Sequence, residues 1–493
     1  MEAFNFNTIK PNNRFRKKPT NSYRSKPLIS ISILAIFFFL IFFLFNTSIF
    51  FPTSIKTTQC LKLQTLKGHK FLWYAPHSGF TNQLSEFKNA VLMAAILNRT
   101  LIVPPVLDHH AVVLGSCPKF RVSDPKQLRF AVWNHAIELI QSHRYVSMAD
   151  VIDLSSLVSD SAVQVIDFRY FVSLFCDIDV NYFCVKDSKM ENSLLEKLKQ
   201  CGTLLSGYSV DTSECVYAVE EDCRTTVWTY QKEGENGSID SFQPDDQLKK
   251  KKNISFVRRR NDVHAALGPH SRANLANVLS FGSLFTSPYK GSESYIDIHE
   301  APKDQKIQSL IKRIEFLPFV NEIMDAGKAY ALHTVKSPFL CAQLRLLDGQ
   351  FKNHRRATFE GLKQKLDFLR QKENLPIHIF VMTDLPISNW SGTYLGDLAN
   401  DPDSFKLFVI SENDNLIQET AKKVVDEGHS MKVGALYNNG IEKDCQRGQM
   451  LPDILLHVEE IVCSCASLGF VGTAGSTIAD SIEMMRKKQI CSP

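Results

Sequence analysis

The stretch that decides the fold reads FLWYAPHSGFTNQ from Phe71 to Gln83, followed by an amphipathic run and by NRTLIVPP at residues 98–105. Phe71 to Tyr74 is a short apolar run that ends at a turn signal, which is typical of a buried strand. Apolar side chains then recur at helical spacing, and Thr100 to Val103 is a β-rich run that two prolines end. Strand, turn, helix and strand predict a βαβ unit.

The turn of this unit allows two interpretations. In open α/β sheets, ligands bind beyond the carboxyl ends of the strands, where the free N–H groups of helix N-termini point. Gly79, Phe80, Thr81 and Asn82 stand at that place, so they predict a site for an anionic ligand. The alternative is an ordinary tight turn in which Asn82 caps the helix.

The rest of the chain continues to alternate strands with helices. This pattern predicts an α/β protein whose parallel sheets are covered on both faces, in two Rossmann-like domains that face a cleft. We place these domains at residues 70–330 and 331–493, with a polar, exposed or disordered insertion at about residues 231–262. The expected strands are Val163–Phe168, Phe339–Arg345, Ile377–Met382, Lys406–Ile410 and Leu468–Val471, and the expected helices are Ile307–Ala329, Arg355–Lys372, Ile454–Ala466 and one from Ile478.

The formal net charge of +5 is concentrated at the start of the 493-residue chain. Residues 1–27 contain only one acidic side chain, Glu2, and the remainder of the chain is close to neutral. This balance argues against a nucleic-acid-binding body, so we expect no nucleic-acid partner. The basic residues of the tail are Lys10, Arg14, Arg16, Lys17, Lys18, Arg24 and Lys26.

An uncharged apolar run from Leu28 to Phe51 lies between Pro27 and Pro52. It is long enough to cross the ~30 Å hydrocarbon core of a bilayer as a helix. It is too long for the apolar region of a signal peptide and lacks a small-residue cleavage site. The basic flank precedes the run, so residues 1–27 are predicted to be cytosolic and the bulk lumenal, as in a type II membrane protein, with residues 52–69 as a stem.

All twelve cysteines follow this predicted anchor, and in an oxidising lumen an even number indicates structural disulfides. The cluster from Cys176 to Cys223 favours local bridges, although the sequence does not give the pairing. Cys463 and Cys465 allow metal or redox chemistry, but their spacing and the apolar helical run around them favour core residues. Possible glycan acceptors are Asn98, Asn236, Asn253 and Asn389; Asn98 is the doubtful one, since it closes a core-facing helix.

A charged side chain ends the apolar strand that contains Gln343, Leu344 and Arg345. Arginine is rarely buried unless it is paired, and its guanidinium matches phosphate oxygens in a bidentate fork. Arg345 therefore predicts a phosphate contact. The alternative is an ion pair with Asp348 or Asp384 that holds two loops together.

Two further loops follow strands in the second domain. Asp384 can accept hydrogen bonds from a base or ribose, or can serve as a helix cap or turn residue. The segment from Gly472 to Thr477 leads into a helix, where Ser476, Thr477 and free N–H groups can hold a phosphate. A structural strand-to-helix turn is the alternative for this segment.

These motifs resemble those of the protein O-fucosyltransferase family. Animal members are similar to Gly-Arg-Phe-Gly-Asn-Gln at the first turn and to Asn-Arg-Thr-Leu-Ala-Val-Pro-Pro after the helix. They have His-x-Arg where this chain has Gln343 and Arg345, and Ala-Thr-Asp where it has Met382, Thr383 and Asp384. The resemblance covers roughly residues 70–490 and is greatest to the large plant group of the family.

The resemblance implies a GT-B glycosyltransferase of the Golgi membrane. The expected reaction is an inverting transfer of fucose from GDP-fucose to a hydroxyl of a protein or a cell-wall glycan. Plant relatives include proteins tied to pectin and mannan synthesis, so the resemblance leaves open a different nucleotide deoxysugar such as rhamnose. A non-catalytic lumenal scaffold is also left open, because Gln343 replaces the family's histidine and the motifs do not fix the general base. No Asp-x-Asp pair stands in a strand-end loop, so Arg345 can supply the positive charge and we expect no metal or other cofactor.

The resemblance also implies roles for individual residues. Arg345, with Ser476 and Thr477, would stabilise the charge that develops on the β-phosphate, and the turn with Asn82 would close onto the sugar. Glu86 is a candidate general base, or else a surface carboxylate that pairs with Lys88 or solvent. The residues expected to contact GDP-fucose are Gly79, Phe80, Thr81, Asn82, Gln343, Leu344, Arg345, Asp384, Ser476 and Thr477.

Overall fold

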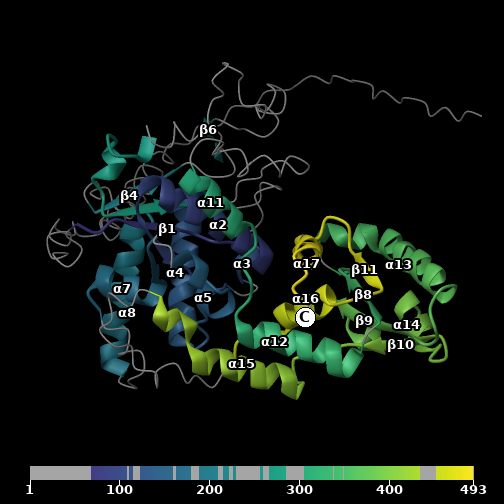
Figure 1. Ribbon diagram of the computed structural model, residues 1–493. Helices are drawn as coiled ribbons and strands as arrows, with labels where there is room; N and C mark the ends of the chain where they lie inside the picture. The colour runs from purple at the N-terminus through teal and green to yellow at the C-terminus, as the bar shows by residue number, and fades with distance from the viewer. Residues whose placement is uncertain are drawn as a thin grey trace, which may run out of the picture. The chain divides into compact units, whose positions relative to one another are not determined.

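The computed structural model (Figure 1) describes residues 68–107, 110–114, 123–158, 163–178, 188–208, 215–220, 226–228, 256–258, 266–284, 305–336, 338–347, 349–433 and 451–491. Within these residues the chain forms two fully parallel sheets and a separate parallel pair of short strands, β5 (Thr226–Trp228) and β6 (Phe256–Arg258). The predicted α/β class is therefore confirmed.

The first sheet has the order β3-β2-β1-β7-β4. Its strands are β1 (Phe71–Tyr74), β2 (Thr100–Val103), β3 (Val165–Asp167), β4 (Val216–Val219) and β7 (Val278–Phe281). Every residue of β1 and β2 is buried, as expected of strands covered on both faces. The predicted βαβ unit is present as β1, α2 (Phe80–Leu97) and β2, with β1 paired in parallel to β2.

Alternate residues of β1 face opposite sides of this sheet. Leu72 and Tyr74 pack in one core with α2 and α11 (Gln305–Glu315). Phe71 and Trp73 pack in a second core with α4 (Pro125–Gln141), α7 (Phe168–Cys176) and α8 (Ser188–Leu205). The shorter helices of this part are α3 (His110–Val113), α5 (Met148–Val151), α6 (Ser155–Val158) and the 3-10 helix Arg272–Asn274.

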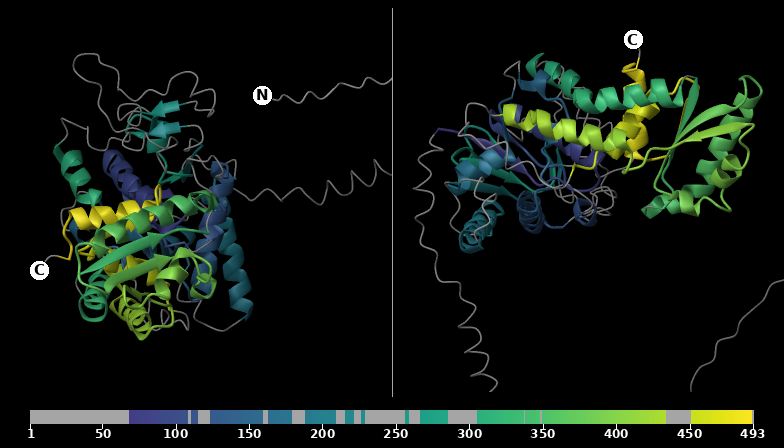
Figure 2. Two further views of the ribbon diagram at one scale, coloured as in Figure 1. Left: turned by 90° about the vertical axis from the view of Figure 1, so that its right-hand side faces the viewer. Right: turned by 90° about the horizontal axis from the view of Figure 1, so that it is seen from below.

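The second sheet has the order β10-β9-β8-β11. Its strands are β8 (Phe339–Leu344), β9 (Ile377–Thr383), β10 (Phe405–Phe408) and β11 (Gly469–Gly472). Helices α13 (Arg355–Arg370) and α14 (Tyr394–Ala399) pack on one face, and α12 (Asn321–Ala329), α16 (Leu455–Ser464) and α17 (Thr477–Lys487) belong to the core of the other (Figure 1). Helix α15 (Asn415–Glu427) lies beside α12 (Figure 2, right).

Several short helical segments complete the second part. A π-helix follows α12 at Tyr330–Val335, and 3-10 helices occur at Gly349–His354, Ile387–Asn389 and His429–Lys432. All the strands predicted from residue 339 onward are present within two residues of their expected bounds.

One sequence prediction, a helix before the second sheet, is wrong. The single helix expected over Ile307–Ala329 is split into α11 and α12, because Pro318 has no N–H to continue the helix and Phe319 forms a bridge with Ile152. The predicted insertion at residues 231–262 contains the strand β6, whose pairing with β5 supplies ordered backbone hydrogen bonds. The rest of that insertion lies outside the described residues.

Two disulfides hold the second part together. Cys341 on β8 is bonded to Cys463 on α16, and Cys465 is bonded to Cys491. Cys463 is buried as expected of a core residue, but it is a bridged cysteine rather than a thiol. In the predicted local cluster, Cys215 is disulfide-bonded while Cys176 and Cys201 carry free thiols.

The predicted anchor, its basic tail and the stem lie outside the described residues. No helix among the described residues is long and apolar enough to span a bilayer. Of the predicted glycan acceptors, Asn98 ends α2 in a left-handed conformation and is exposed, so its place at the end of a core-facing helix does not bury it. Asn389 is also exposed, whereas Asn236 and Asn253 are outside the described part.

Candidate functional site

The strand order of the second sheet reverses at β8. The chain passes from β8 to β9 on one side and later returns to β11 on the other side. Ligands of open α/β sheets bind beyond the carboxyl ends of the strands at such a switch point. Gln343 lies opposite Gly472 in the β8–β11 pair, so the loops with Arg345 and with Ser476 leave the sheet side by side.

Thr473 ties these two loops together. Its N–H lies 3.0 Å from the Gln343 carbonyl and 3.2 Å from the Gln343 side-chain oxygen. Its hydroxyl oxygen accepts a hydrogen bond of 2.8 Å from the Arg345 N–H. Thr473 was not among the site residues predicted from the sequence, although its place directly after a predicted strand was a usable signal.

The three residues at the carboxyl end of β8 differ in the groups that they present to a ligand. The Gln343 side chain is buried and occupied by Thr473, and the Leu344 side chain lies wholly in the core, so it presents only backbone. Arg345 is half-buried, and its guanidinium carbon lies 4.9 Å from the centroid of the Phe351 ring. Of these three predicted contacts, Arg345 has the side chain best placed to meet an anion.

Asp384 holds the loop that follows β8. Its two carboxylate oxygens accept hydrogen bonds from the N–H groups of Leu346 and Leu347, at 2.7 and 3.0 Å. The structure thus favours the turn-residue interpretation of Asp384 over a contact with base or ribose. The carboxylate fixes the backbone that carries Arg345.

Ser476 has a buried hydroxyl without a partner. It occupies the N-cap position of α17 but makes no side-chain cap bond, and it is 0% exposed. Its Oγ finds no hydrogen-bond partner among the described residues. Gly475 precedes it at φ +72°, a left-handed conformation that favours glycine. An unsatisfied hydroxyl at a helix N-terminus is suited to a phosphate oxygen.

The turn after β1 begins the helix earlier than the sequence suggested. Gly79 is the N-cap residue of α2, and the Asn82 N–H donates to the Gly79 carbonyl at 2.9 Å. Asn82 therefore lies inside the first turn, and the alternative in which it caps the helix is wrong. The Thr81 Oγ is buried and, like that of Ser476, has no partner among the described residues.

The backbone of this turn is held from inside the protein. The Gln83 amide donates to the carbonyls of Ser78 and Leu107, both at 2.9 Å, and its oxygen accepts from the Leu107 N–H. Ser78 has φ +69°, which is uncommon for a residue other than glycine. The His77 ring lies 2.9 Å from the Ser78 hydroxyl and 2.8 Å from the Ser283 hydroxyl.

Glu86 lies beneath the turn and not on the surface. It is 0% exposed, and its Oε1 accepts a 3.3 Å hydrogen bond from the His77 N–H. Burial raises the pKa of Glu86 well above its ordinary value, against the opposing effect of backbone hydrogen bonds from His77 and Leu284. The expectation of a surface carboxylate paired with Lys88 is wrong, because Lys88 donates to the Glu315 carbonyl. Glu86 as the structure places it has no solvent exposure through which to reach an acceptor.

The turn meets the second part of the chain through aromatic rings. The Phe80 ring centroid lies 4.2 Å from that of His457 on α16, and Phe319 lies 5.0 Å from the same imidazole. Burial lowers the pKa of His457 to about 3, so this ring is neutral at any physiological pH. Because α16 leads into β11, these ring contacts connect the turn of Asn82 with the loop of Ser476. The sequence analysis missed His457, a lone histidine in an apolar helix.

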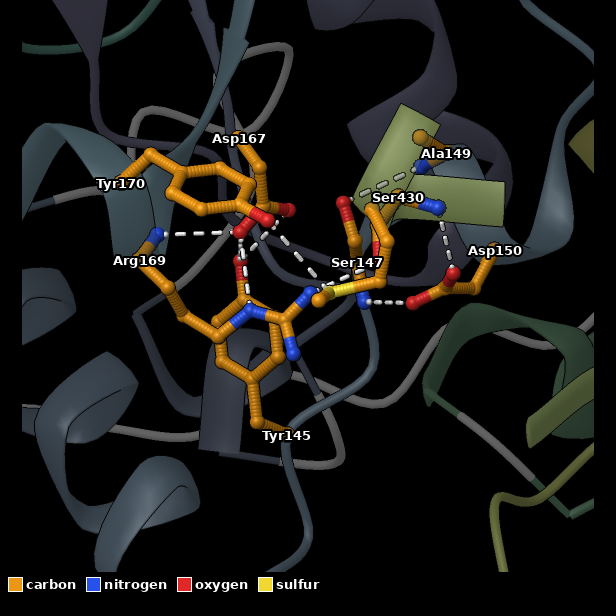
Figure 3. A network of polar contacts seen from close by, with 9 residues as sticks. Tyr145, Ser147, Ala149, Asp150, Asp167, Arg169, Tyr170 and Ser430 are labelled. Atoms are coloured by element: carbon orange, nitrogen blue, oxygen red, sulfur yellow. Dashed lines mark hydrogen bonds and ion pairs between the residues drawn. The ribbon is translucent and has the colours of Figure 1, made fainter. Parts of the chain in front are cut away.

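A buried polar network joins the carboxyl end of β3 to the 3-10 helix after α15 (Figure 3). Arg169 pairs with Asp167 at 2.8 Å and donates to the Ser430 hydroxyl at 2.7 Å. The Ser430 N–H donates to Asp150 at 2.8 Å, and Tyr145 stacks under the guanidinium at 4.5 Å. The network brings together residues far apart in sequence, which local patterns cannot reveal.

Comparison with known proteins now decides the family. Residues 71–377 match the family described as GDP-fucose protein O-fucosyltransferase. The chain belongs to this family. O-fucosyltransferase 30 of Arabidopsis thaliana is 55% identical over 505 residues, which cover 99% of both chains.

Solved structures show only a distant similarity. POFUT1 in complex with GDP is 12% identical at a TM-score of 0.36, and POFUT1 in complex with GDP-fucose is 11% identical at the same score. Each covers 85% of this chain and 94% of its own. The fold of this chain is defined by the two parallel sheets described above.

The family match spans the turn after β1 and the loop after β8. Asp384, Ser476 and Thr477 lie beyond residue 377, and for them the similarity rests on the 55% identical relative. The expected family and the glycosyltransferase class are confirmed.

Proposed function

We propose that this O-fucosyltransferase transfers fucose from GDP-fucose to an acceptor hydroxyl of a protein or a cell-wall glycan, with inversion at the anomeric carbon. The observation that carries the proposal is the buried, unpartnered hydroxyl of Ser476 at the start of α17, on the loop beside Arg345 at the switch point of the second sheet. We propose a GT-B arrangement, in which two Rossmann-like domains face a cleft that holds the donor.

The diphosphate would lie against the second sheet. Arg345, the hydroxyls of Ser476 and Thr477 and the free N–H groups of α17 would stabilise the charge that develops on the β-phosphate. The guanidinium supplies a fixed positive charge, so the proposal requires no metal ion. Asp384 and Thr473 position this set because both hold the backbone around Arg345.

The turn of the first sheet would contact the sugar and the diphosphate. Thr81 brings a buried hydroxyl that has no partner among the described residues, and Asn82 brings a half-buried amide on the first turn of α2. Glu86 supports the turn from below through His77, so we propose a positioning role for this carboxyl rather than proton transfer.

Gln343 supports a second candidate. The family has histidine at this position, and here the amide is engaged by the Thr473 N–H. A different nucleotide deoxysugar such as rhamnose, or a non-catalytic scaffold, would be compatible with that change.

We also propose that residues 28–51 anchor the chain in the Golgi membrane with the folded part in the lumen. The uncharged run, its basic flank and the bonded pairs Cys341–Cys463 and Cys465–Cys491 support this orientation, because disulfides persist in oxidising compartments.

The test is titration of the full-length chain in detergent with GDP-fucose and with GDP-rhamnose, by calorimetry. We expect saturable GDP-fucose binding that Arg345→Ala abolishes and that Lys422→Ala, an exposed change on α15, leaves intact. Tighter binding of GDP-rhamnose would transfer the proposal to the second candidate, and binding of neither nucleotide would leave only the scaffold. For a turning-over enzyme, proton NMR of the product should show the anomeric configuration opposite to that of the donor.

A further inference from the structure

A group of basic side chains follows Arg345 in the chain. Lys352, His354 and Arg356 are exposed and Arg355 is half-buried; we name these four residues the basic rim. No described residue forms an ion pair with any of them within 4.0 Å. The rim is therefore a patch of positive charge open to solvent.

The rim lies in an electrostatically unfavourable place. Arg355 and Arg356 are the first two residues of α13, and His354 is its N-cap residue. Helix N-termini carry partial positive charge and favour acidic residues, yet the first turn of α13 has none, and His354 makes no side-chain cap bond. In contrast, α4 and α7 of the same chain are capped by Asp124 and Asp167.

Basic side chains at a helix start weaken the helix, and among the described residues only Arg355 of the rim gains a ring contact, with Phe359 at 5.7 Å. Positions where local rules are broken without a structural gain are expected at functional sites. An anionic partner would relieve the repulsion at this helix start. The exposed side chains fit an extended ligand better than a small enclosed one.

The rim is joined to the proposed donor site by a direct contact. Phe351, which precedes Lys352, is buried, and its ring lies 4.9 Å from the guanidinium carbon of Arg345. A ligand held on the rim would therefore lie beside the residue that we assign to the diphosphate. Donor phosphates already have Arg345, Ser476 and Thr477, so the rim is available to the acceptor.

We propose that the basic rim binds an acidic polypeptide, the segment of a protein acceptor in which Asp and Glu surround the hydroxyl that receives the sugar. This inference rests on the proposed function. The guanidinium groups of Arg355 and Arg356 match carboxylates in a bidentate fork, and the family is described as transferring to protein.

The test measures binding of fluorescein-labelled poly-L-glutamate to the full-length chain in detergent by fluorescence anisotropy. Lys352→Ser/Arg356→Ser removes two exposed charges, and Lys422→Ser/Lys423→Ser removes two exposed charges of α15 as a matched control. The rim variant should bind poly-L-glutamate about tenfold more weakly, and the control should bind like the wild type. Raising the salt concentration should reduce the difference in poly-L-glutamate affinity between the wild type and the rim variant.

Other results would overturn the proposal. Equal affinity of the rim variant and the control for poly-L-glutamate would remove the rim as its binding surface. Tighter, rim-dependent binding of polygalacturonate would assign the rim to an acidic polysaccharide instead of a polypeptide. A calorimetric loss of GDP-fucose binding in the rim variant would assign these cations to the donor.

The calorimetric arm also separates this proposal from the proposed function. If wild-type chain fails to bind GDP-fucose, the transferase assignment fails whatever the rim binds. If GDP-fucose binding is intact and poly-L-glutamate is not bound, only the rim proposal fails. Equal melting temperatures of the two double variants would show that the comparison is between folded proteins.

Discussion

Replacing Ser476 by alanine should move stability and donor binding in opposite directions. An N-cap serine usually contributes ~0.5–2 kcal/mol through its side-chain bond to the helix, but Ser476 makes no such bond. Its buried, unpartnered oxygen instead costs the folded protein about 1–3 kcal/mol in desolvation. Without ligand, Ser476→Ala should therefore melt at the same temperature as the wild type or higher.

Affinity for the donor should fall, because Ser476→Ala removes the hydroxyl that would donate a hydrogen bond to a phosphate oxygen in the complex. A hydrogen bond to a charged group contributes about 1.5–3 kcal/mol, which corresponds to a loss of roughly tenfold to a hundredfold in GDP-fucose affinity. Thermal melts without ligand and calorimetric titration with GDP-fucose measure the two effects separately.

Ser280 provides the matched control. It is also 0% exposed, but its hydroxyl donates to the Leu205 carbonyl at 2.6 Å. Ser280→Ala leaves that interaction unmade, so it should lower the melting temperature and spare GDP-fucose affinity. If Ser476→Ala is destabilised as much as Ser280→Ala and binds GDP-fucose normally, the Ser476 hydroxyl is structural and our reasoning is refuted.

Three other predictions concern the supports of the site. Burial lowers the pKa of His457 to about 3, so the neutral ring contributes its full stability above the ordinary histidine pKa near ~6.5, and that stability is lost as the pH falls from there toward 3. The melting temperature of the wild type should therefore fall more between pH 7 and pH 4 than that of His457→Phe. An equal drop in both proteins would contradict the buried neutral ring. Cys341→Ala/Cys463→Ala removes a disulfide between residues 122 positions apart and should lower the free energy of unfolding by up to about 5 kcal/mol. Denaturant titration of the variant and the wild type measures this loss, and Cys176→Ala, which removes a free thiol, is the control. Arg169→Met leaves Asp167 buried without its cation and should cost about 3–5 kcal/mol; an unchanged denaturation midpoint would show that Tyr145 and the backbone alone satisfy that carboxylate.

Much of the fold was predictable because its signals are local. The apolar run of β1, the helical spacing of α2 and the arginine at the end of β8 each occupy a short window of sequence. The failed helix over Pro318 also carried a local signal, the missing N–H of proline, which the apolar periodicity on either side obscured. The loops with Arg345 and Ser476 came together because parallel strands end at one edge of a sheet.

The supports of the site were not predictable, because they join distant residues. The ring of His77 meets Ser283 across 206 positions, and Arg169 meets Ser430 across 261. Burial also reversed the interpretation of Glu86. A polar helix residue between Ser85 and Lys88 is expected at the surface, and only the packed structure shows that the position faces the core.

The position of Phe80 suggests why the turn of the first sheet can act on a site built by the second. Its ring packs at a tilt against His457, which belongs to the helix that leads into β11 and the Ser476 loop. The imidazole is neutral and adds no charge near the proposed diphosphate, so this contact can hold the turn against α16 without attracting the phosphate. Burial raises the pKa of the Glu86 carboxyl below the turn, which disfavours a negative charge there. In this arrangement Arg345 is the charged group of the proposed donor site, and the remaining contacts are hydroxyls, amides and helix N–H groups. The negative charge that develops on the leaving diphosphate would therefore be stabilised mainly by one guanidinium.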